Sequence, residues 1–156
     1  MKLPFSLYLQ NIWILIAVLL PNLLFLFLKP KDAIKPSYKN LILKIFEHVG
    51  RIGMIFLPFF YEFRIIGTLD FTFFGLMMIC LVLYYACWIR YFVGRSSLLL
   101  YGPFVFIPVP LALSPVIYFL CAAVVQKSIL LFAFTLIFSI GHLPISRFNY
   151  LNCKKQ

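Results

Sequence analysis

Acidic residues are scarce in this chain. Only four of its 156 residues are Asp or Glu, against 14 Lys and Arg, so charged residues make up 12% of the chain and its net charge is +10. Three of the acids, Asp32, Glu62 and Asp70, fall in segments that we expect to be loops. Glu47 is then the only carboxylate expected inside a helix, which excludes general acid–base catalysis by paired carboxylates.

Motifs for metal, nucleotide and acyl-transfer chemistry are also missing. The two histidines belong to no HExxH sequence, and there is no glycine-rich phosphate loop, GxSxG elbow or dinucleotide fingerprint. The cysteines, which are Cys80, Cys87, Cys121 and Cys153, show neither CxxC nor zinc-type spacing. We therefore expect no metal, no cofactor and no catalytic residue. Whether the chain is an enzyme stays open, and the absence of enzymatic activity is favoured.

Apolar residues dominate instead. Hydrophobic residues make up 64% and aromatic residues 19% of the chain, and its mean hydropathy is +1.04. Several apolar runs approach or exceed the roughly 20 residues that a helix needs to cross a bilayer. We predict an all-α fold, a polytopic transmembrane helix bundle of about five spans that forms a single integral membrane domain over residues 1–156. The expected spans lie near residues 7–28, 41–61, 71–93, 103–125 and 128–144.

The fourth of these spans is rich in proline, with Pro103, Pro108, Pro110 and Pro115. Proline lacks a backbone donor and disfavours helical geometry at the preceding residue, so we predict a span that is broken near residues 108–110. Carbonyls freed there must be buried in protein or face a wet cavity. Two interpretations stay open: a kink that shapes packing, or a broken helix of the kind found at transporter binding sites.

Basic residues cluster at the ends of the apolar runs, a pattern typical of membrane topology, and we expect no nucleic acid as a partner. If all five spans cross, the loops alternate between the two sides. One side holds Lys29, Lys31, Lys35, Lys39, Arg95, Arg147, Lys154 and Lys155, and the other holds Lys2, Arg64 and Lys127. The positive-inside rule then predicts a multi-pass protein of the plasma membrane with its N-terminus outside and its C-terminus in the cytoplasm.

The segment KIFEHVGRIG, residues 44–53, concentrates the scarce charges. On a helix, Asn40, Lys44, Glu47, His48 and Arg51 fall within about one third of the circumference. Two interpretations stay open. The stripe is either the interfacial start of the second helix, with basic side chains that reach anionic head groups, or it is buried within the bundle. A buried ionisable residue would be a candidate functional group.

Further polar residues are expected at the same depth, in the cytoplasmic half of the membrane. Each also has an ordinary role: Asn22 follows Pro21 and would satisfy a kinked backbone, Arg90 would anchor a helix at the interface, and His142 would mark a helix end before Pro144. If these residues converge with the stripe, the candidate ligand-binding set is Asn22, Lys44, Glu47, His48, Arg51, Arg90 and His142.

In such a site Arg51 and Arg90 would bind an anion, and His48 or His142 would titrate. Glu47 would orient a partner or accept a proton. The expected ligand is an anionic lipid head group or a phosphorylated amphiphile.

Several blocks of the chain together resemble small multi-pass membrane proteins of low-GC Gram-positive bacteria. The blocks are PNLLF (21–25), FEHVGRIGM (46–54), WIRYFVG (88–94), PVPLALSPVIYFL (108–120) and GHLPISRFNY (141–150). The resemblance covers most of the chain and implies a bacterial membrane protein, but it implies no activity.

A looser set of residues, His142, Pro144 and Asn149 with Tyr150, is similar to isoprenylcysteine-type membrane methyltransferases. The adjacent His-Pro pair of that family is interrupted here by Leu143, and the chain has no separate cofactor-binding segment. The chain therefore departs from this second family at the residues that would matter for activity.

Three functional hypotheses follow. The favoured one is non-enzymatic binding, at the cytoplasmic leaflet, of an anionic lipid or amphiphile or of a membrane-protein partner, which includes a second copy of the chain. The second is a small proton-coupled transporter or transporter subunit, with Glu47 as the coupling group. The third is a lipid-modifying enzyme with His48 or His142 as base, which requires both histidines at a common cavity.

Overall fold

The computed structural model describes residues 7–32, 40–104 and 106–155, and in these ranges the chain is helical and contains no strand. The elements are η1 (Leu9–Asn11), α1 (Ile12–Phe27), α2 (Leu41–Phe56), η2 (Leu57–Phe60), α3 (Thr68–Gly94), α4 (Ser97–Tyr101), α5 (Pro110–Val125) and α6 (Ile129–Lys154). The predicted all-α bundle is confirmed. Lys2, Lys35 and Lys39, which entered the topology prediction, lie outside the described residues.

Three stretches of helix in the described ranges are long and apolar enough to cross a membrane, namely Leu9–Phe27, Thr68–Gly94 and Ile129–Lys154. α5 is also apolar but shorter. Large hydrophobic side chains such as Phe27 on α1 and Val82 on α3 point outward and are exposed. Such apolar outer surfaces are unusual in a soluble monomer, and they support the prediction of a membrane protein.

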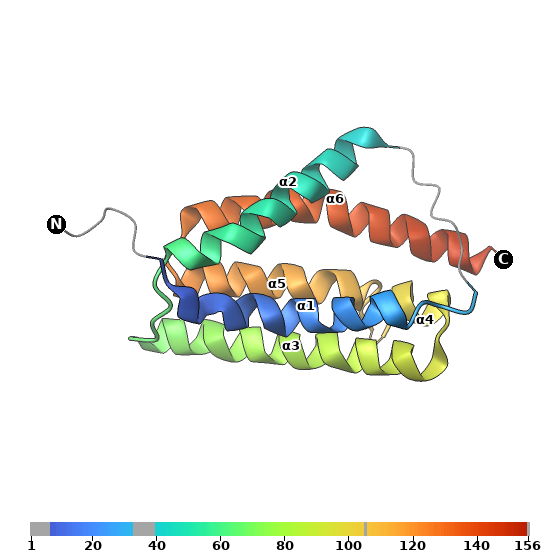
Figure 1. The fold of residues 1–156 in the computed structure, drawn as a ribbon, viewed down its shortest axis with the longest axis horizontal. Coiled ribbons are helices and arrows are strands. Elements are labelled where there is room, and N and C mark those ends of the chain that lie inside the picture. Colours follow the sequence, from blue (N-terminus) through green and yellow to red (C-terminus); the bar gives the residue numbers. More distant parts are fainter. Residues whose placement is uncertain (1–6, 33–39, 105, 156) are drawn as a thin grey trace.

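The long helices lie roughly along the long axis of the molecule, and α2 crosses them at an angle, with its first turn standing away from the others (Figure 1). α2 packs along α6, α6 packs on α5, and α5 packs on α3, while α1 contacts α3 and η2. The core between them contains buried side chains from several helices, including Ile14, Met77, Tyr118 and Leu131. These helix contacts place α1, α3 and α5 around a shared interior, and α2 and α6 cover that interior.

α2 begins at a helix cap. The side-chain Oδ1 of Asn40 accepts hydrogen bonds from the backbone N–H groups of Ile42 (3.0 Å) and Leu43 (3.3 Å). Asn caps of this kind satisfy donors that have no partner in the first turn of a helix. The helical projection had placed Asn40 on the polar stripe with Glu47 and Arg51. In the structure Asn40 caps the N-terminus of α2 instead.

α6 differs from its predicted course. We expected a helix end near His142 and Pro144, but the helix continues through Pro144 to Lys154, so that His142 lies inside it. Proline inside a helix removes one backbone hydrogen bond and is costly. α4 packs against this helix. α5, in turn, begins with Pro110 at its first position, where the missing N–H of proline has no partner to lose.

Two side-chain amides hold the turn that follows α2. The Nδ2 of Asn11 donates to the carbonyl oxygens of Pro58 and Tyr61, both at 2.8 Å, and the Nε2 of Gln126 donates to the same two oxygens at 2.9 and 3.1 Å. Both amide side chains are buried. We call this arrangement the amide clamp. It satisfies backbone carbonyls at the end of a helix.

A second contact ties two loops together at the other end of the molecule. The Oδ1 of Asp32 accepts from the backbone N–H of Ser97, and its Oδ2 accepts from the hydroxyl of Ser96, both at 2.8 Å. The Lys31 N–H also donates to the Arg95 carbonyl at 3.0 Å. The hydrogen bonds from Ser97 and Ser96 lower the pKa of the Asp32 carboxyl below its ordinary value.

Acid is expected to release this loop contact. Because the folded-state pKa of Asp32 is lowered, the carboxylate contributes stability above the unfolded pKa of about 3.9, and the contribution is lost as pH falls through the lower folded value. Hydrogen exchange at the Ser97 amide should therefore accelerate, relative to the intrinsic rate, between pH 6 and pH 3. In Asp32→Ala the amide should exchange fast at both values. Equal protection of the Ser97 amide in the wild type and in Asp32→Ala at pH 6 would contradict this role of Asp32.

Candidate functional site

A pocket of about 370 Å³ lies in the interior that the helices share. This volume is within the range of small-molecule sites, about 300–1,000 Å³. Its walls come from every named α-helix of the described chain and from the segment before α5. The lining residues are Leu15, Val18, Leu19, Asn22, Phe25, Arg51, Met54, Ile55, Tyr84, Trp88, Leu100, Tyr101, Val109, Leu111, Ala112, Pro115, Phe119, Phe138, His142 and Ser146.

The walls formed by α1 and α5 are almost entirely apolar. Where α1 meets α3, the polar groups satisfy one another: the Nδ2 of Asn22 donates to the Tyr84 hydroxyl at 2.7 Å and to the Val18 carbonyl at 2.8 Å. The Tyr84 hydroxyl in turn donates to the Val18 carbonyl at 3.1 Å. Asn22 thus lines the pocket as expected, but its amide donor is already used in holding α1 to α3.

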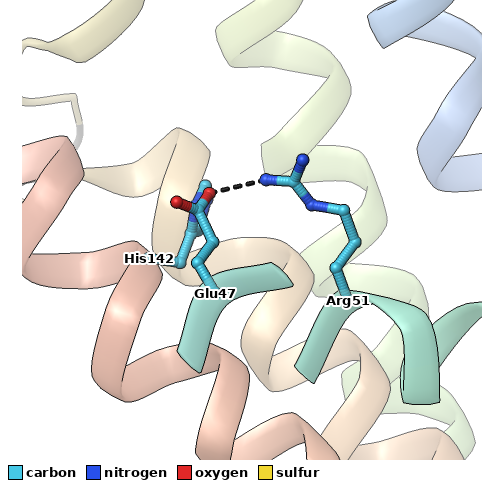
Figure 2. Close-up of polar contacts among 3 residues, drawn as sticks. All are labelled: Glu47, Arg51 and His142. Carbon is cyan, nitrogen blue, oxygen red and sulfur yellow. Dashed lines mark hydrogen bonds and ion pairs between the residues drawn. The ribbon is translucent and has the colours of Figure 1, made fainter. Parts of the chain in front are cut away.

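The opposite wall, formed by α2 and α6, is charged. Oε1 of Glu47 lies 2.5 Å from Nη2 of Arg51 and 2.9 Å from Nδ1 of His142 (Figure 2). The exposed fraction is 13% for the Glu47 side chain, 22% for His142 and 48% for Arg51. Arg51 and His142 line the pocket. We call Glu47, Arg51 and His142 the charged cluster.

An aromatic ring orients the cluster. The rings of Phe138 and His142 stack with centroids 4.5 Å apart and an interplanar angle of 23°. The guanidinium carbon of Arg51 lies 6.0 Å from the centroid of the same Phe138 ring. Stacking with Phe138 and the hydrogen bond to Glu47 together restrict the imidazole to one orientation beside the pocket.

Three glycines bring α2 and α6 into the contact that makes the cluster. A Cβ on Gly50 would lie 2.3 Å from the backbone nitrogen of Phe138, and one on Gly141 would lie 2.3 Å from the Leu43 carbonyl oxygen. A Cβ on Gly53 would meet the Phe134 ring at 2.2 Å. Small residues at a helix crossing allow backbones to approach closely, which is a common device between membrane helices. These glycines were not among the residues selected from the sequence, although the Gly50-x-x-Gly53 spacing was an available signal.

The glycines also explain which part of the charged stripe turns inward. Gly50 faces α6, and Glu47, three positions before it, is about 60° away on the helix circumference. Arg51 lies about 100° from Gly50, and His48 about 160°. Glu47 therefore meets α6 and Arg51 reaches along the margin, while Lys44 and His48 are exposed and do not line the pocket.

Lys44 and His48 were predicted to belong to the ligand-binding set, but neither lines the pocket. The enzymatic hypothesis required both histidines at a common cavity, and of the two only His142 is among the pocket-lining residues. Among the described residues, no three His, Cys, Asp or Glu side chains lie together as a metal site would require.

Arg90 also lies away from the pocket lining, although we expected it to bind an anion. Its guanidinium donates to the carbonyl oxygens of Leu99 and Pro103, both at 2.8 Å. The same group lies 5.0 Å from the Phe104 ring centroid. Arg90 therefore satisfies carbonyls at the end of α4 and in the segment that follows.

Tyr101 and Ser146 add polar groups to the pocket lining that the sequence analysis did not select. Tyr101 ends α4 and Ser146 lies one turn after His142 on α6, so both depend on the unexpected course of these two elements.

No known protein family, curated protein or solved structure matches the chain. The resemblance to small membrane proteins of Gram-positive bacteria therefore stays a prediction, and the function must be argued from the pocket itself.

Proposed function

We propose that the chain is an integral protein of the bacterial plasma membrane with five spans. The spans are α1, α2 with η2, α3, the segment 103–125 with its break before Pro110, and α6. The C-terminal ends of α1, α3 and α6 lie at the same end of the molecule in Figure 1, as alternating spans require. That end carries Lys29, Lys31, Arg95 and Lys154, which supports a cytoplasmic position for it and an N-terminus outside.

Within this frame we propose that the pocket binds a single-chain amphiphile with a phosphate head group. The observation that carries the proposal is the composition of the walls: α2 and α6 contribute Arg51 and His142 beside apolar side chains, while α1 and α5 contribute apolar side chains and one amide, Asn22. A ligand that satisfies both walls needs an anionic group and an alkyl chain on the same molecule. Membrane lipids are then the source of the ligand, and binding involves no chemical reaction.

Arg51 is the residue best suited to hold the head group. A guanidinium has five N–H donors, and the structure uses Nη2 toward Glu47. Nearly half of the side chain remains exposed, so a phosphate group can reach the guanidinium. The alkyl chain would lie against Leu15, Leu19 and Phe119.

The test is equilibrium binding of dodecyl methyl phosphate, a phosphodiester with one fixed negative charge, to the full chain in a neutral detergent. A hydrogen bond to a charged group contributes about 1.5–3 kcal/mol, so Arg51→Gln should weaken binding about 10- to 100-fold. Lys44→Gln is the matched control, because it removes the same charge from the same helix at an exposed position outside the pocket. Its effect should stay below about twofold.

A neutral dodecyl glycoside supplies the second control and should not compete for the site. Equal weakening by Arg51→Gln and Lys44→Gln would mean that only the net charge of the protein attracts the anion. Equal binding of the neutral amphiphile would mean that the charged cluster plays no part. Either result would overturn the proposal.

A further inference from the structure

Glu47 is already paired with the Arg51 guanidinium, the cation that the ligand would need. One carboxylate oxygen contacts both Arg51 and His142, and the Glu47 side chain is only 13% exposed. A hydrogen bond between Oε1 of Glu47 and Nδ1 of His142 needs one proton between the two atoms. With the imidazole neutral, the formal charges of Glu47, Arg51 and His142 sum to zero.

We propose that binding of the anionic head group is coupled to the uptake of one proton by the Glu47–His142 pair. The inference rests on the proposed function, because it concerns the same pocket and ligand. It assigns Glu47 a regulatory role: the carboxylate holds Arg51 in the empty site and competes with the ligand for it.

Binding of an anion changes the charge balance of the charged cluster. A monoanion that takes Arg51 leaves Glu47 with His142 as its near partner and brings the charge of the cluster with ligand to −1. In an environment of low dielectric constant, an uncompensated charge is costly, and groups exchange protons to remove it. Protonation of the second ring nitrogen of His142 returns the sum to zero and gives Glu47 a full cationic partner.

Other titratable groups near Glu47 are poorly placed for this role. On α2 the neighbours besides Arg51 are Lys44 and His48, which are exposed and do not line the pocket. On α4 the neighbour is Tyr101, a phenol that is neutral near pH 7. α6 supplies His142, which makes direct contact with the carboxylate. The proton comes from solvent, no covalent bond changes, and the charge is balanced before and after binding.

The experiment is titration calorimetry with dodecyl methyl phosphate at pH 8, in two buffers that differ in ionisation enthalpy. An isolated imidazole is neutral at this pH, and the phosphodiester does not titrate, so the buffer dependence counts protons taken up by the protein. We expect uptake that approaches one proton per bound ligand and a decrease in affinity as pH rises further.

Glu47→Gln should bind more tightly at pH 8 than the wild type and with no proton uptake, because a neutral amide does not compete for Arg51. His142→Gln provides a second variant in which the uptake should be lost. His48→Gln is the control and should retain it, since His48 is exposed outside the pocket.

Each outcome separates the two proposals. Binding with proton uptake that disappears in both cluster variants supports the coupling. Wild-type binding without uptake, or uptake that persists in Glu47→Gln and His142→Gln, overturns the coupling but leaves the amphiphile site standing. Absence of binding by the wild type overturns the site and the coupling together.

Discussion

Gly141→Ala is expected to push α2 away from α6 and to lower the free energy of unfolding by about 3 kcal/mol, the upper part of the usual range for overpacking. The added Cβ would lie 2.3 Å from the Leu43 carbonyl oxygen and 2.5 Å from the Glu47 backbone nitrogen. These are backbone atoms, which cannot move aside as the end of a flexible side chain can. The measurement is equilibrium unfolding in mixed micelles with increasing fractions of a denaturing detergent.

Gly75→Ala on α3 is the matched control, because no atom lies within 4 Å of the added methyl group. Alanine at an open helical position should stabilise the protein slightly, by about 0.5–1 kcal/mol. The two substitutions are chemically identical and should change the stability in opposite directions. Equal effects would mean that the α2–α6 contact is looser than the structure shows, and the geometry of the charged cluster would lose its support.

The amide clamp gives the second large expected effect. Asn11→Ala or Gln126→Ala alone leaves one amide to donate to the Pro58 and Tyr61 carbonyls. Removal of both amides leaves these buried oxygens without either donor, and an unsatisfied buried polar group costs about 1–3 kcal/mol. The double variant should therefore lose about 1–2 kcal/mol more than the sum of the single variants.

A double-mutant cycle of unfolding free energies measures this coupling. Gln10→Ala serves as the control, because Gln10 is an exposed amide next to Asn11 and its loss should have little effect. Strict additivity of Asn11→Ala and Gln126→Ala would show that the two amides do not share the same carbonyls.

Much of the helical framework could be predicted from the sequence, because long apolar runs carry a strong local signal. The run at 71–93 became α3, Thr68–Gly94, and the segment 41–61 became α2 with η2. Glu47 and Arg51 form an ion pair at i, i+4 spacing, which is a favourable arrangement on a helix. Arg51 was selected as part of the polar stripe and Asn22 and His142 by their expected depth, and all three line the pocket.

The remaining features depend on contacts between distant segments, which local patterns do not encode. His142 meets Glu47 because Gly50 and Gly141 let two helices approach. α6 continues through Pro144 and packs against α4, an element that the sequence pattern did not predict. Arg90 donates instead to the carbonyls of Leu99 and Pro103, on either side of Gly102, which its position in the sequence does not reveal. Asn11, which holds the amide clamp from the other end of the chain, gave no local sign of its role.

Fluorescence of Trp88 tests the amphiphile site most directly. The chain has two tryptophans, and Trp13→Phe leaves Trp88, which lines the pocket, as the sole indole. We predict that a dodecyl methyl phosphate brominated along its chain quenches Trp88 in a saturable manner, that the unbrominated compound reverses the quenching, and that Arg51→Gln shifts saturation to about 10- to 100-fold higher concentration. Quenching that never saturates, or that is the same in Arg51→Gln, would contradict binding in the pocket.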